Sequence, residues 1–404
     1  MGNKKGNIIG GAALITGSCV GAGALGLPVV TGLCGFFPSL FFLFFMSGFM
    51  MISSFLLVEA LSWFPEQEKI NLPFLVSQTM GPVGVAFCWG SYLFLFYSLL
   101  IAYIDGIGAH ISNISYTYLK MNLPSCLGSL FFVLLFGGII YFGIKPIDIV
   151  NRILIVIKIC VFLVLVGFVF PFIHLQHLAN LHLKYALIAL PILVVSFGFQ
   201  NVIPTLFYYL GKDVKRTQKS IFLGVICTFC IYLLWQITAI GSIPFKGPGG
   251  LLESYNAGID AALALSKITK MKSIQYSSSL LAFFAILTSF LAQSISLVHF
   301  LSDGFKIKES KMNKENLWIC LLVLVPSTLF AMANPGIFYL ALQFAGGICA
   351  VFLFGILPSI MIWIGRYKMH LVSNYSVAGE EKLLIGVLVI SSTILVYQIA
   401  NFMM

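Results

Sequence analysis

The chain has 404 residues, of which 60% are hydrophobic and only 9% are charged. Soluble domains usually contain about 45–50% apolar and about 25% charged residues. This composition excludes a cytosolic enzyme, a disordered protein and a disulfide-rich secreted scaffold. The net charge of +10 does not indicate nucleic acid here, because Lys and Arg of a membrane protein gather in its cytoplasmic loops. We therefore expect an all-α integral membrane protein.

Continuous apolar runs predict eleven transmembrane helices, since a bilayer core needs about 20 apolar residues per helix. The strands of a membrane barrel would instead alternate in hydrophobicity. No other stretch is long enough for a soluble domain, so residues 1–404 are expected to form one membrane domain. The expected spans are 7–34, 36–59, 84–108, 126–144, 149–173, 185–210, 219–243, 274–302, 317–334, 336–365 and 383–403.

The distribution of basic residues predicts the orientation of the chain. With the N-terminus inside, 17 of the 23 Lys and Arg residues fall in cytoplasmic segments and six fall outside. The opposite orientation would violate the positive-inside rule. We therefore expect a cytoplasmic N-terminus and a C-terminus on the outer side.

Two of the expected spans are interrupted at corresponding places. The first contains six glycines followed by Pro28, and the sixth contains Gly198 and polar residues followed by Pro204. Gly and Pro disfavour a helix interior, and unpaired backbone is tolerated in a membrane where it lines a cavity or is buried in protein. An odd number of spans per half predicts an inverted repeat, 7–173 and 185–365, with an extra helix at 383–403. Close helix packing is the alternative reason for the glycines.

The two interruptions carry recognisable sequences. GSCVGAGALGLP at 17–28 resembles the first-span motif of the hydroxy and aromatic amino acid permease family, and SFGFQNVIPTL at 196–206 resembles its sixth-span signature. The greater similarity is to the tyrosine/tryptophan permease branch, within the amino acid–polyamine–organocation superfamily. The resemblance implies a leucine-transporter-like five-plus-five inverted repeat with discontinuous helices 1 and 6.

The resemblance also implies the activity. The expected function is secondary active, proton-coupled symport of tyrosine or tryptophan into the cell, by alternating access, across the bacterial inner membrane. The expected partners are an aromatic amino acid, a coupling ion (H⁺, with Na⁺ as the alternative) and the lipid bilayer. No enzyme activity, cofactor, metal site, nucleic acid or obligatory protein partner is expected.

The substrate would be held mainly by backbone groups exposed at the two interruptions. The amides around Gly21, Ala22 and Gly23 would bind its carboxylate, since a half-helix N-terminus favours an anion. Carbonyls near Cys19 and in 195–198 would bind its ammonium. The expected substrate-binding residues are Cys19, Gly21, Ala22, Gly23, Val195, Ser196, Phe197, Gly198, Phe199, Gln200 and Asn201.

Aromatic residues are the expected walls for the substrate ring, with ordinary packing as the alternative for each. Gln200 and Asn201 are polar at membrane depth, where they could contact the substrate or bond neighbouring helices. The candidate walls are Phe197, Phe199, Tyr92, Tyr97 and Phe94.

Ionisable residues inside a span suggest the coupling site. The resemblance places Lys158 where sodium sits in sodium-coupled relatives, so that loss of its proton would mimic ion release. The alternative is a lysine that snorkels to the interface. Thr288 and Ser289 match the region that supplies sodium ligands in those relatives. Glu59 and Asp105 are expected to be interfacial and solvated.

Other functions remain as alternatives. The same fold could serve serine, threonine or a branched-chain amino acid, or could be sodium-coupled. A channel would be expected to show a filter sequence or charge rings, and a membrane enzyme would need a nucleophile and a base. Neither pattern is present in the sequence.

Overall fold

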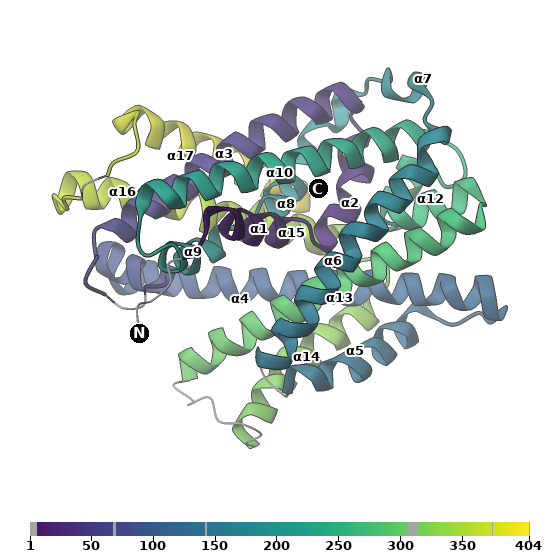
Figure 1. Ribbon diagram of the computed structural model, residues 1–404, viewed down its shortest axis with the longest axis horizontal. Helices are drawn as coiled ribbons and strands as arrows, with labels where there is room; N and C mark the ends of the chain where they lie inside the picture. The colour runs from purple at the N-terminus through teal and green to yellow at the C-terminus, as the bar shows by residue number, and fades with distance from the viewer. Residues whose placement is uncertain (1–5, 68–69, 142–143, 306–313, 374, 404) are drawn as a thin grey trace.

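The computed structural model describes residues 6–67, 70–141, 144–305, 314–373 and 375–403, and every regular element in these ranges is helical (Figure 1). The longer helices are α1 (Ile8–Cys19), α2 (Ala22–Gly32), α3 (Phe36–Ser62), α4 (Leu72–Ile114), α5 (Ser125–Tyr141), α6 (Ile144–Val169), α8 (Ala189–Ser196), α10 (Val214–Ser242), α12 (Ala261–Thr269), α13 (Lys272–Phe305), α14 (Lys314–Ala333) and α17 (Glu380–Met403). Shorter helices are α7 (Leu175–Leu178), α9 (Ile203–Tyr209), α11 (Leu251–Asn256), α15 (Phe338–Phe344) and α16 (Leu357–Trp363).

Eight of the described helices are long and apolar enough to cross a membrane, and the bent pair of α1 and α2 makes a ninth if it is one span. Two shorter apolar helices, Ser125–Ile140 and Leu317–Ala333, lie at two further expected spans. The prediction of an all-α membrane protein is therefore confirmed, with eight to nine candidate spans. Several lysines used for the expected orientation, such as Lys4, Lys69 and Lys306, lie outside the described residues.

The span expected at 84–108 is much longer in the structure. Helix α4 begins at Leu72, where the Asn71 side chain accepts a hydrogen bond from the Phe74 amide at 2.9 Å. It bends at Gly81, whose φ of +68° suits glycine, and Pro82 follows. A π-helical turn, Ser115–Leu119, prolongs its other end. Hydropathy did not reveal the first part, because a Gly-Pro pair usually ends a helix.

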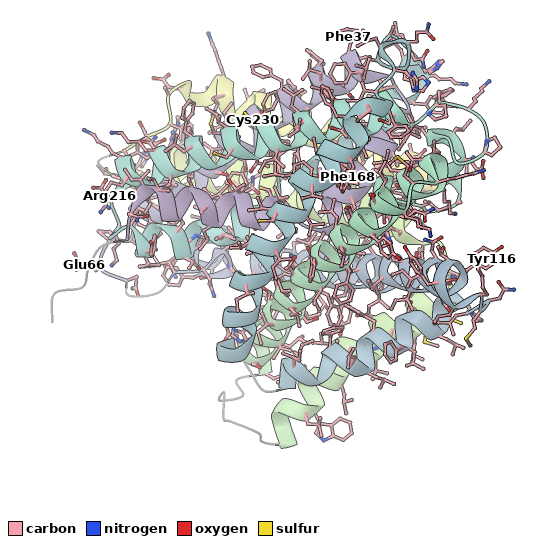
Figure 2. The ribbon with its side chains drawn as sticks, turned by 45° about the vertical axis from the view of Figure 1, so that its right-hand side comes forward. Phe37, Glu66, Tyr116, Phe168, Arg216 and Cys230 are labelled. Atoms are coloured by element: carbon pink, nitrogen blue, oxygen red, sulfur yellow. The ribbon has the colours of Figure 1, made fainter. Side chains whose placement is uncertain are left out.

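The ends of the molecule are distinguished by the elements they carry. Helix α12 lies at one end, which we call the α12 end, and helix α9 lies toward the opposite end, which we call the N-terminal end (Figure 1). Figure 2 shows Phe37 and Tyr116 near the α12 end, and Glu66 and Arg216 near the N-terminal end. Helix α1 packs along α10, and α13 packs against both α4 and α6. Helices α10 and α13 also contact α2, so both lie against the first interrupted segment.

The two carboxylates expected to be solvated are buried, so that expectation was wrong. Glu59 is 1% exposed and forms an ion pair with Arg366 through two contacts of 2.6 Å. Asp105 is 5% exposed and accepts hydrogen bonds from the Gly336 and Phe338 amides at 3.0 Å each. A buried carboxylate requires such partners, and here they come from segments more than 200 residues away in the chain.

Candidate functional site

The first interruption divides one span into α1 and α2. The two helices meet at residues 20–21 with a bend of 61°. Gly21 is extended, with φ −118° and ψ −157°, a conformation open to any residue. A Cβ on Gly21 would lie 2.5 Å from Ser289 Oγ, so a larger residue here would displace that hydroxyl.

The second interruption separates α8 from α9. Helix α8 ends at Ser196, residues Phe197 to Phe199 are non-helical, and a short 3₁₀ turn leads into α9. Pro204 stands in the first turn of α9, where its missing N–H costs nothing. The two interruptions are adjacent, since a Cβ on Gly23 would lie 3.4 Å from Val195 and 3.9 Å from Ser196 Oγ.

Tyr232 of α10 connects the two interruptions. Its hydroxyl lies 2.6 Å from the Cys19 carbonyl and 2.8 Å from the Ser196 carbonyl. The neighbouring Trp235 donates from Nε1 to the Ala24 carbonyl at 2.9 Å. The sequence analysis missed both residues. Aromatic residues make up 15% of the chain, and nothing in the local pattern sets these two apart.

Most of the expected backbone ligands already have protein partners. The Cys19 carbonyl accepts from the Gly21 amide at 2.8 Å and shares the single hydroxyl hydrogen of Tyr232 with the Ser196 carbonyl. The Val195 carbonyl accepts from the Gly198 amide at 3.0 Å. The Ala22 amide donates to Ser289 Oγ at 2.9 Å. A substrate would therefore share or displace these contacts.

Three side chains of the second interruption retain unpaired buried atoms. Ser196 Oγ, Gln200 Oε1 and Asn201 Oδ1 are buried without a hydrogen-bond partner among the described residues. The other end of the Gln200 amide donates to the Met50 carbonyl of α3 at 3.1 Å. An unsatisfied buried polar group costs about 1–3 kcal/mol. Such groups are suited to pairing with a polar ligand.

Lys158 of α6 reaches the first interruption. Its side chain is 3% exposed, and its ammonium donates to the Val20 carbonyl, between α1 and α2. Thr288 Oγ1 lies 3.4 Å from Nζ and itself donates to the Ala285 carbonyl. The snorkelling alternative is therefore wrong. Neither ion pair formed by the described residues includes Lys158.

The expected aromatic walls divide into two groups. Phe197 and Phe199 are fully buried, and the Phe197 ring meets Tyr232 edge-on at 5.3 Å between centroids. Phe94 is 58% exposed, and the Tyr97 hydroxyl donates to the Leu322 carbonyl of α14. These two side chains point away from the interruptions.

Two further residues on α4 clarify which part of that helix faces the site. Tyr92 packs against Phe96 and Phe300. Tyr103 is 4% exposed and lies close to Ser289. Because Ser289 contacts Ala22 and Gly21, Tyr103 lies beside the first interruption, and the sequence analysis missed it.

A cavity of about 220 Å³ lies against the first interruption. Gly21, Lys158, Tyr232 and Trp235 are among its lining residues, together with apolar side chains of α6, α10 and α13. The site thus combines an ammonium, backbone polar groups and an apolar volume. No nucleophile–base arrangement accompanies them in the described part of these helices.

Comparison with known sequences identifies the family. The model of the tryptophan/tyrosine permease family matches residues 4–398. The chain belongs to this family.

The permease is similar to bacterial relatives over nearly its whole length. It is 29% identical to tyrosine-specific transport system 1 of Haemophilus influenzae, covering 95% of this chain and 94% of that protein. It is 28% identical to the tryptophan-specific transport protein of Haemophilus influenzae, over 93% and 91% of the two chains. The low affinity tryptophan permease of Proteus vulgaris is 26% identical over 96% and 93%. The permease is therefore a multi-pass membrane transporter and not an enzyme.

Proposed function

We propose that this permease carries tyrosine or tryptophan into a bacterial cell together with a proton, by alternating access around the two interruptions. The substrate class is supported by the names of relatives that align with almost the whole chain. The proton is supported by one observation above all, the contact of the Lys158 ammonium with the Val20 carbonyl.

The backbone around Gly21 to Gly23 forms the proposed carboxylate site. Helix α2 starts there, so its first amides carry the positive end of the helix dipole. The Ala22 amide currently pairs with Ser289 Oγ, and a substrate carboxylate would replace that hydroxyl as acceptor. Tyr103, which lies close to Ser289, would donate to the same carboxylate.

The second interruption forms the proposed ammonium site. The Ser196 carbonyl has one described donor, Tyr232, so one lone pair remains for an ammonium. The Val195 carbonyl already faces the Gly198 and Phe197 amides, so an ammonium there would share it with them. The Cys19 carbonyl accepts from the Gly21 amide and competes with the Ser196 carbonyl for the Tyr232 hydrogen, so it joins when that hydrogen turns to Ser196. The unpaired oxygens of Gln200 and Asn201 would accept from the phenol or indole, while Phe197 and Phe199 border the ring.

Lys158 is the proposed proton carrier. A charged ammonium holds the Val20 carbonyl strongly, because charge-assisted hydrogen bonds are about twice as strong as neutral ones. After the proton leaves, the neutral amine holds this carbonyl more weakly, and α1 can move relative to α2. Protonation and the geometry of the substrate site are thereby linked. Sodium coupling would instead place the ion at Thr288 and Ser289.

The proposed architecture is a pair of inverted repeats, 7–173 and 185–365, followed by the extra helix 383–403. An interruption in α1/α2 and another in α8/α9 support it. The N-terminal end would be cytoplasmic and the C-terminus external, as the count of basic residues predicts.

Uptake into proteoliposomes tests the proposal. Labelled tyrosine and tryptophan would be offered to the purified protein with a proton gradient or a sodium gradient imposed separately. We expect uptake driven by the proton gradient, competed by aromatic amino acids. The variant Lys158→Ala should lose this dependence. Lys212→Ala is the matched control, because Lys212 also donates to carbonyls, of Pro65 and Gln67, but at an exposed position.

Other outcomes would point elsewhere. Uptake driven by sodium and unaffected by Lys158→Ala would move the coupling site to Thr288 and Ser289. Competition by serine, threonine or branched-chain amino acids would change the substrate but keep the fold.

A further inference from the structure

Phe338, the first residue of α15, lies where several helices meet on the α12 side of the interruptions. Its side chain is 1% exposed. A Cβ on Gly26 of α2 would lie 2.7 Å from the Tyr339 ring and 3.1 Å from the Phe338 ring, and a Cβ on Gly106 of α4 would lie 3.2 Å from the Phe338 ring. Two helices thus present glycines to the same ring, which fills the space between them.

The position of Phe338 along the site follows from its neighbours. Gly26 is four residues beyond Ala22, so it lies about 6 Å further along α2 than the proposed carboxylate site. The same Cβ on Gly26 would lie 3.2 Å from Ile192 of α8, and that on Gly106 would lie 3.6 Å from Ile286 of α13. Helices α2, α4, α8 and α13 therefore surround the ring about one turn from the interruptions.

Asp105 holds the first turn of α15 in place, and thereby holds the Phe338 ring. Its two carboxylate oxygens accept from the Gly336 and Phe338 amides at 3.0 Å each. Asp105 is next to Gly106 in α4, so one short segment both holds the Phe338 backbone and receives its side chain. The following residue, Tyr339, donates to the Ile259 carbonyl at 2.7 Å, just before α12.

We propose that Phe338 is the plug that closes the route from the substrate site to the α12 end, and that Asp105 is the positioning residue that holds it closed. The inference rests on the proposed function, since alternating access requires such a closure. Opening toward the α12 end then requires α15 to leave the Asp105 carboxylate. Loss of that carboxylate should let the ring leave its place between the glycines.

Thiol labelling of Ile192→Cys tests the plug from both ends separately. Ile192 is 1% exposed and lies beside the ring. Exposed native cysteines, Cys160, Cys227 and Cys230, would be replaced by alanine. A charged, membrane-impermeant thiol reagent would be added to intact cells and to inverted vesicles, which present opposite ends of the protein. The parent chain without Ile192→Cys gives the background.

We expect Asp105→Asn to raise the labelling rate at least about tenfold from the α12 end and to leave the rate from the other end unchanged. Phe338→Ala should do the same while retaining Asp105, which keeps the test valid if Asp105→Asn fails to fold. Asp213→Asn is the matched control. Asp213 also accepts from a helix-start amide, that of Arg216 at 3.0 Å, but on α10 at the N-terminal end. It should change neither rate.

Equal acceleration from both ends, or none from the α12 end, would overturn the plug. Labelling needs no substrate, so its failure is distinct from a failure of the proposed function. Side-selective acceleration in a protein that takes up no amino acid would refute the function and retain the plug. Normal uptake without side-selective acceleration of labelling would refute the plug and retain the proposed function.

Discussion

The two halves of each interrupted segment differ sharply in burial. All eleven residues of α2 are buried, against four of the twelve in α1. Seven of the eight residues of α8 are buried, against three of the seven in α9. The buried pieces are the second half of one segment and the first half of the other. The buried half of each segment is therefore the one nearer the α12 end, whether it comes first or second in the chain. This is expected of two segments that enter the membrane from opposite sides.

This difference coincides with the contacts made at the α12 end. Around α2 and α8, the contacts of Phe338, Asp105 and Tyr339 close the α12 end. Around α1 and α9, a larger share of the residues is exposed. The following substitutions test this difference between the buried and the exposed halves.

The largest effect is expected from filling the junction between the buried and exposed halves. Gly21→Leu should abolish uptake, because its side chain would collide with Ser289, which lies 2.5 Å from the position of a Cβ. Uptake of labelled tyrosine and tryptophan, normalised to protein in the membrane, measures the effect. Gly90→Leu is the matched control, since a Cβ on Gly90 meets nothing within 4 Å. A well-inserted Gly21→Leu protein with normal uptake would contradict the placement of the carboxylate site.

The next largest effect concerns the ion pair of Glu59 and Arg366. Glu59→Gln should lower the free energy of unfolding by about 3–5 kcal/mol, because it leaves the arginine without its buried partner. Thermal unfolding in detergent measures this loss. The double variant Glu59→Met with Arg366→Met should recover most of the stability, since it removes both charges. A single variant as stable as the parent would mean that water reaches this pair.

A smaller effect is expected where α10 ties the halves together. Tyr232→Phe keeps the ring against Phe197 and removes only the hydroxyl between the Cys19 and Ser196 carbonyls. We expect roughly tenfold slower uptake, which corresponds to about 1.4 kcal/mol, the size of one good hydrogen bond. Tyr375→Phe is the control, because that hydroxyl bonds Gln218 away from the site. Equal losses in both variants would assign the Tyr232 hydroxyl a purely structural role.

The smallest effect is expected from mild acid at the α12 end. Burial raises the pKa of the Asp260 carboxyl, but attraction to His110, its hydrogen bond at 2.5 Å and two backbone amides outweigh burial, so the pKa is lowered. A carboxyl with a lowered pKa stabilises the fold above its ordinary value of 3.8 and loses that contribution as the pH falls further. The difference in melting temperature between the parent and Asp260→Asn should therefore persist down to about pH 4.5. If the difference in melting temperature disappeared before the pH had fallen to about 4.5, the pKa of Asp260 would not be lowered.

The sequence predicted the interruptions because glycine, proline and polar residues act locally. The pattern around Gly21 and Pro204 disfavours a continuous helix wherever the rest of the chain lies. Lys158 could also be selected from the sequence, since an ionisable residue within an apolar run is conspicuous. Its choice between the interface and the core depended on Val20, 138 residues away, and only the structure resolved it.

The sequence analysis missed the residues whose role depends on a partner far away in the chain. Glu59 and Asp105 stand near expected span ends, and hydropathy gave no sign of Arg366 or of the start of α15. Tyr103 and Tyr232 resemble every other tyrosine in an aromatic-rich chain. Their importance comes from the polar groups they meet across helix interfaces, which no local pattern encodes.

The isolation of the Lys158 ammonium has an electrical consequence. It lies well inside α6 and forms neither of the ion pairs made by the described residues, so its charge is not cancelled locally. Under the proposed mechanism, a zwitterionic amino acid and one proton cross together and carry one net positive charge. A membrane potential of 100 mV does about 2.3 kcal/mol of work on such a charge, equivalent to roughly a 50-fold concentration ratio. The voltage alone would thus concentrate the substrate inside, even without a pH difference.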